Sequence, residues 1–132
     1  FDCGVFERRF DFIVAQSIVT HAGPDLAAKL LASAARALEQ NGLLLFNYIQ
    51  HGGGQEAAEG WHYPRCIAYA PPAMAAMIKR ARLAFTPLPW YHPRASWIAA
   101  ALSPAALPDT RHLAHLSGAV LRSEQFADSL ER

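Results

Sequence analysis

The chain has 132 residues, of which 52% are hydrophobic and 17% are charged. This balance excludes a disordered chain and suits one compact unit with a single core. Twelve basic and eleven acidic residues give a net charge of +1, which excludes the strongly basic footprint of a nucleic-acid-binding protein. A small molecule or another protein is therefore the expected partner.

Cysteine usage and hydropathy bear on the compartment. The two cysteines, Cys3 and Cys66, stand far apart in the sequence, and we expect neither a signal peptide nor a disulfide framework. Apolar runs such as Ile98 to Leu102 are much shorter than the ~20 residues that cross a bilayer. We therefore expect a cytoplasmic chain without a membrane segment.

A first strand is predicted from Phe10 to Ala15, where the sequence is almost continuously apolar. That pattern is typical of a strand covered on both faces inside a parallel sheet. Polar side chains follow its carboxyl end, where open α/β sheets bind their ligands. They belong to Gln16, Ser17, Thr20 and His21. The alternative interpretation is that these side chains only satisfy neighbouring backbone groups.

A helix is predicted next, from Pro24 to the Asn41-Gly42 pair. Proline suits the first helical position, and Asn-Gly suits a left-handed stop. Apolar residues recur every four positions from Leu26 to Leu38, so one helix face should pack on the sheet. Ser33 belongs to the opposite face, which should meet water.

A second buried strand is predicted from Leu43 to Ile49. A strand, a helix and a parallel strand connect right-handedly in nearly all known cases, so these elements should form one βαβ unit. Asn47 and Tyr48 should then approach the same sheet edge as Ser17.

The segment after Ile49 contains three consecutive glycines, 52 to 54, and has no helical or strand period. We expect a long mobile loop that acts as a lid, in which Trp61, His62 and Tyr63 cover a ligand. A floppy insertion is the alternative. A phosphate cradle is disfavoured because the glycine spacing matches neither common phosphate-binding pattern.

The second half is predicted to contain a helix from Pro71 to about Leu83, with a core-facing methionine stripe, followed by strands at 85–91 and 96–102. The turn between these strands, at His92-Pro93-Arg94, is short, so they should pair antiparallel. Prolines within the first strand place it at a sheet edge. Residues 113 to 132 have a weak helical period.

No metal site or hydrolase motif is predicted. The set of His51, His62 and Cys66 and the pair of His112 and His115 lack the spacing of zinc ligands. Ser17 lacks the nucleophile elbow, and no paired carboxylates follow the predicted strands.

The order of these elements resembles the second half of the Rossmann-like fold of class I S-adenosylmethionine-dependent methyltransferases. The landmarks that carry the resemblance are Phe10-Asp11, Ser17-x-x-Thr20-His21, Glu39-Gln40-Asn41-Gly42-Leu43-Leu44-Leu45 and Tyr69-x-Pro71. They lie within residues 1 to 102, which would form a single partial domain that residues 103 to 132 extend with helix.

The resemblance implies S-adenosyl-L-methionine as the cofactor and a role for each candidate residue. Gln16, Ser17 and His21 would lie nearest the transferred methyl group, and His21, or less favourably His92, would remove a proton. Asp2 and Cys3, with Gln16, would contact the cofactor. The residues expected to bind the acceptor are Tyr48, Trp61, Tyr91 and His92.

The chain departs from the family in lacking its glycine-rich turn and the acidic residue that ends its second strand. The strand from Phe10 to Ala15 would also have an unpaired outer edge, which a missing N-terminal half or a second copy should cover. Our leading hypothesis is the substrate-side portion of a methyltransferase that acts on an oxygen or nitrogen of a small molecule. The alternatives are a non-catalytic half-domain for protein interaction or oligomerisation, and a site for another nucleotide-like ligand.

Overall fold

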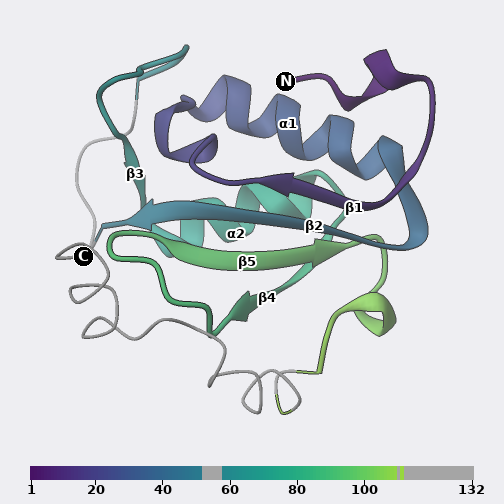
Figure 1. Ribbon diagram of the computed structural model, residues 1–132. Helices are drawn as coiled ribbons and strands as arrows, with labels where there is room; N and C mark the ends of the chain where they lie inside the picture. The colour runs from purple at the N-terminus through teal and green to yellow at the C-terminus, as the bar shows by residue number, and fades with distance from the viewer. Residues whose placement is uncertain (52–57, 110, 112–132) are drawn as a thin grey trace, which may run out of the picture.

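The computed structural model describes residues 1–51, 58–109 and 111 (Figure 1). Its sheet has the strand order β1-β2-β5-β4, and the short strand β3 pairs with β2. The strands are β1 (Phe10–Ala15), β2 (Leu38–Gln50), β3 (Ala68–Tyr69), β4 (Ala84–Leu88) and β5 (Ser96–Ala101). β1 and β2 run parallel, whereas β5 is antiparallel to both β2 and β4. The predicted parallel βαβ unit with a following antiparallel pair is confirmed.

The helices α1 (Pro24–Ala37) and α2 (Pro71–Arg80) pack on the same face of the sheet, and Figure 1 shows α2 behind the strands. Leu31 of α1, Ile78 of α2 and Phe46 of β2 are fully buried in the core between them. Met74 is also buried and Met77 packs against this core, so the predicted methionine stripe is confirmed. Each such buried side chain contributes about 1.5–3 kcal/mol.

The predicted helix stop at Asn41-Gly42 is wrong. α1 ends at Ala37, and these residues lie inside β2, where the register against β1 shifts between Phe10 and Phe12. A Cβ atom at position 42 would lie 2.7 Å from the carbonyl oxygen of Phe10. Glycine is therefore needed there for the close approach of the two strands, and not for a left-handed cap.

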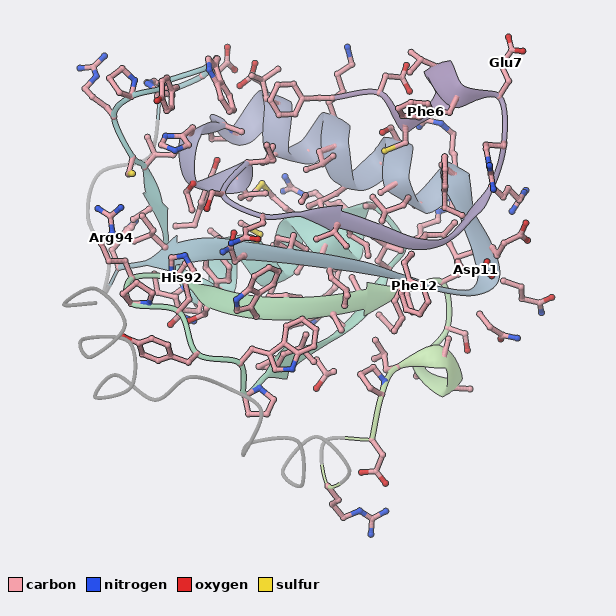
Figure 2. All side chains as sticks on the ribbon, viewed as in Figure 1. Phe6, Glu7, Asp11, Phe12, His92 and Arg94 are labelled. Carbon is pink, nitrogen blue, oxygen red and sulfur yellow. The ribbon has the colours of Figure 1, made fainter. Side chains whose placement is uncertain are left out.

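The prediction that β1 is covered on both faces is also wrong. Ile13 and Ala15 pair with β2 residues of the helix-covered core, but Phe12 and Val14 are 65% and 61% exposed. They lie on the face away from α1 and α2, which we call the open face, and Figure 2 shows Phe12 in front of the strands. Among the described residues, no strand pairs with the outer edge of β1.

The described residues cover the open face over β4, β5 and part of β2. A small cluster of Leu88, Trp97 and Ala99 is buried there, and Trp90 and Leu107 pack against it. β4 lies at the other edge of the sheet, which agrees with the position predicted from its prolines, although it ends at Leu88.

The N-terminal segment lies along α1 and buries Ser33, which was expected to face water. The hydroxyl of Ser33 donates to the carbonyl of Phe1 over 3.1 Å and accepts from the backbone amide of Cys3 over 2.9 Å. The predicted C-terminal helix lies outside the described residues. Within the described part of the chain, no helix is long and apolar enough to cross a membrane.

Candidate functional site

The polar residues predicted to follow β1 lie at the edge of the sheet where β1, β2 and β4 end and β5 begins. We call this the carboxyl edge. Gln16 and Ser17 leave β1 there, and both are exposed. Figure 2 shows His92 and Arg94 at the opposite end of the sheet from Asp11, which is near the start of β1.

Ser17 occupies a left-handed backbone conformation, with φ of 56°. Its backbone amide donates to the Oδ1 atom of Asn47 in β2 over 2.7 Å. Asn47 is fully buried, and its Nδ2 atom has no hydrogen-bond partner among the described residues. The end of β1 is thus held by a side chain of the neighbouring strand.

His21 lies in a short 3₁₀ helix, Val19–His21, that follows this turn. Its Nδ1 atom is 2.8 Å from the carbonyl oxygen of Arg65. A carbonyl oxygen only accepts hydrogen bonds, so Nδ1 carries the proton and, in the neutral ring, Nε2 keeps a free lone pair. The rings of Trp61 and Tyr63 lie 5.7 Å and 5.2 Å from the imidazole, centroid to centroid. His21 therefore combines a proton acceptor with exposed aromatic surfaces.

Trp61 and Tyr63 belong to residues 58 to 67, which we call the covering segment. Backbone hydrogen bonds tie this segment to the residues after β1: Gly23 N to Gly60 O, 2.7 Å; His62 N to His21 O, 2.8 Å; and Ile67 N to Thr20 O, 2.8 Å. The predicted lid therefore has a fixed part. Residues 52 to 57, the rest of that predicted loop, lie outside the described residues.

Asp25 supplies a further tie. One of its carboxylate oxygens accepts the Gly60 amide over 2.8 Å, and this hydrogen bond holds the pKa of Asp25 below its usual value of 3.8. Asp25 also stands in the first turn of α1, where a negative charge favours the helix dipole.

Tyr48 lies on the other face from Asn47. It is 3% exposed within the helix-covered core, and burial raises the pKa of its phenol. The side chain of Tyr48, predicted to bind the acceptor, is therefore enclosed in the core between the sheet and the helices.

His92 and Tyr91 lie in the connection between β4 and β5 and are half-buried. The Nδ1 atom of His92 accepts the backbone amides of Arg94, at 3.1 Å, and Ala95, at 2.9 Å. The proton of the neutral ring is then on Nε2, the nitrogen left for a ligand. Burial, and next the charge of Arg94, lower the pKa of His92 and favour this neutral form. His92 can donate a hydrogen bond but is poorly suited to act as a base.

The hydrogen bonds of Asp2 and Cys3 lie within the N-terminal segment and between it and α1. Asp2 caps the short N-terminal 3₁₀ helix by accepting the Gly4 amide, and Cys3 donates its amide to Ser33. Both roles support local structure. In the described part of the chain, no group of three or more histidine, cysteine, aspartate or glutamate residues is arranged to hold a metal ion.

Two contributors were not among the residues predicted for the site. Asn47 was expected at this edge of the sheet without a role, and its signal is that it is the one amide side chain in the run Leu43 to Ile49. The carbonyl of Arg65 has no sequence signal, because any residue carries one. Tyr63 was expected only as part of a lid.

The fold has clear counterparts among solved structures. An O-methyltransferase family protein from Burkholderia thailandensis matches with a TM-score of 0.54 and 14% identity, over 73% of this chain and 31% of that one. An O-methyltransferase family 2 protein from Planctomyces limnophilus, in complex with apigenin, matches with a TM-score of 0.55 and 18% identity. This match covers 70% of this chain and 31% of that one. The fold is methyltransferase-like.

The methyltransferase-like fold is also that of the glycopeptide N-methyltransferase MtfA, solved with S-adenosyl-L-homocysteine, at a TM-score of 0.53 and 15% identity. That match covers 74% of this chain and 56% of MtfA, so the chain spans between about a third and just over half of these neighbours. No protein-family model and no curated protein matches the sequence.

Proposed function

We propose that the chain is the substrate-side portion of an S-adenosylmethionine-dependent methyltransferase that acts on an oxygen or nitrogen of a small molecule. The observation that carries the proposal is His21, whose Nδ1 is bonded to the Arg65 carbonyl so that Nε2 is left as a proton acceptor. The neighbours add support, because they include O- and N-methyltransferases and complexes with both forms of the cofactor.

Bound S-adenosylmethionine would supply an electrophilic methyl group. His21 would take the proton of the attacking hydroxyl or amine at Nε2, a step that contributes about 10²–10⁴-fold in typical enzymes. Trp61 and Tyr63 would hold a flat acceptor against His21 and exclude water, since their rings are exposed beside it. Alignment of the acceptor with the methyl group would provide much of the remaining rate.

The described residues fit only one side of the cofactor. Gln16 and Ser17 would lie against its reacting end, and the open face beside them is uncovered at Phe12 and Val14. We infer that additional polypeptide covers this face and pairs with the outer edge of β1. The remainder of a longer chain is favoured over a second copy, because the neighbours are longer than the matched region. Two free cysteines suit a cytoplasmic setting.

Substitution of His21 tests the proposed base. In the methyltransferase assembled with its completing segment, at saturating cofactor, His21→Ala should lower turnover by about 10²-fold or more. His62→Ala is the matched control, because its Nε2 bonds the Ala58 carbonyl within the covering segment. Undiminished turnover of His21→Ala would reject this assignment.

The second candidate is a non-catalytic half-domain that binds protein through the open face. The exposed phenyl ring of Phe12 and the free edge of β1 favour it. Calorimetry with S-adenosylhomocysteine separates the two candidates when the chain is assembled with its completing segment, because only the methyltransferase should then give binding heat.

A further inference from the structure

Asn47 is placed unusually for an amide side chain. It lies near the carboxyl end of β2, in the apolar run from Leu43 to Ile49, is fully buried and pairs in register with Trp97 of β5. Its Oδ1 atom accepts the Ser17 amide, and its Nδ2 atom has no partner among the described residues. Buried polar atoms without partners are rare and call for an explanation.

The orientation of this side chain is fixed by its partner. A rotation of the amide by half a turn would bring Nδ2 against the Ser17 N–H, and both groups are donors. The oxygen must therefore face Ser17, and Nδ2 must be the atom that goes unpaired. Asn47 therefore accepts a hydrogen bond from the Ser17 amide through Oδ1, while its Nδ2 donor stays buried without a partner among the described residues.

The turn itself needs support. Ser17 has a φ of 56°, in a region that residues other than glycine adopt rarely and at a cost. The chain changes direction at Gln16 and Ser17, directly after β1. Within the described part of the chain, the Ser17 amide bonds the Asn47 side chain and no backbone carbonyl. The Asn47 oxygen is the tertiary contact that holds the amide in this direction.

We propose that Asn47 is a positioning residue of the candidate site, which fixes the left-handed turn at Ser17 and thereby sets how Gln16 and Ser17 face a ligand. The inference rests on the proposed function for the identity of that ligand. The proposal does not require Asn47 to stabilise the fold. Removal of its carboxamide also removes the unpaired donor, and Ser17 is an exposed residue whose amide can turn to water.

Hydrogen exchange of the full chain tests the turn without any ligand. Asn47→Leu keeps the volume, removes both polar atoms and should accelerate exchange of the Ser17 amide about tenfold or more. The matched control is Ser33→Ala, which removes a buried acceptor of the Cys3 amide on the other face. Ser33→Ala should accelerate hydrogen exchange of the Cys3 amide and leave that of the Ser17 amide unchanged. Equal exchange at Ser17 in the unmodified chain and Asn47→Leu would overturn the inference.

Ligand binding separates positioning from structural support. In the methyltransferase assembled with its completing segment, S-adenosylhomocysteine should bind about tenfold more weakly to Asn47→Leu than to Ser33→Ala, at similar melting temperatures. Asn47→Asp, which keeps an oxygen for Ser17, should recover the protection of that amide. Equal weakening in Asn47→Leu and Ser33→Ala would overturn the positioning role. No binding to the assembly with unmodified Asn47 would reject the proposed cofactor, while hydrogen exchange would still decide whether Asn47 holds the turn.

Discussion

Gly23→Ala should displace the covering segment. A Cβ atom at this position would lie 2.4 Å from the carbonyl oxygen of Ala58 and 2.8 Å from backbone atoms of Glu59. These atoms belong to backbone, so the clash is relieved only by moving the segment. The backbone angles of Gly23, φ −64° and ψ 171°, are open to any residue, so steric contact alone decides the outcome.

The magnitude follows from the hydrogen bonds that break. Gly23 N to Gly60 O and Gly60 N to the Asp25 carboxylate are both lost if the segment moves. The bond from the buried Gly23 amide is worth about 1 kcal/mol net, so its loss alone should lower the free energy of unfolding by about that amount. For a domain of this size that loss lowers the melting temperature by roughly 3–5 °C.

Thermal unfolding followed by circular dichroism measures this loss, and tryptic cleavage at the exposed Arg65 reports the movement of the segment. Gly23 is the N-cap residue of α1, where serine is preferred to alanine. Gly23→Ser therefore retains a good cap but adds the same Cβ atom. An unchanged or raised melting temperature for Gly23→Ser would refute the steric reasoning. Gly4→Ala, whose Cβ would meet only the Asp2 side chain, is the control.

Phe12→Ser should change the stability of the chain by no more than about 0.5 kcal/mol, because this side chain is 65% exposed, whereas Ile13→Ser on the helix-covered face should cost about 1–3 kcal/mol in urea unfolding. The depressed pKa of Asp25 stabilises the chain above its ordinary value of 3.8, so the melting-temperature advantage over Asp25→Ala should disappear as pH falls below 3.8. Burial raises the pKa of Tyr69 to about 12, so stability should fall between pH 10 and 12, and Tyr69→Phe should reduce that fall.

The antiparallel half of the fold was readable from sequence because its signals are local. The turn at His92 limits the connection between β4 and β5, and Pro87 excludes β4 from the centre of a sheet. The stripe at Met74 and Ile78 likewise gives the buried face of α2.

The errors arose where the deciding partner is distant. The apolar composition of β1 indicates that both of its faces are buried. In the described part of the chain, Ile13 and Ala15 contact the helix-covered core, whereas Phe12 on the other face is exposed. Gly42 serves the approach of two strands, which a local Asn-Gly pattern does not reveal.

The candidate site was readable only in part. The position of His21 after a strand predicted to be buried made it a candidate base, which stays a prediction, but the tautomer of its ring depends on a carbonyl 44 residues along the chain. Strand alternation puts Asn47 and Tyr48 on opposite faces, yet which face is filled by helices is a tertiary fact.

The long strand β2 has a consequence for the order of assembly. It pairs with β1 on one side and with β5 on the other, and the first partner precedes it while the second follows long after it. During synthesis, β1, α1 and β2 can associate as soon as they emerge, whereas the second edge of β2 stays bare until β5 is made. We expect a nascent chain paused between α2 and β5 to be the form most prone to aggregate, and most dependent on a chaperone.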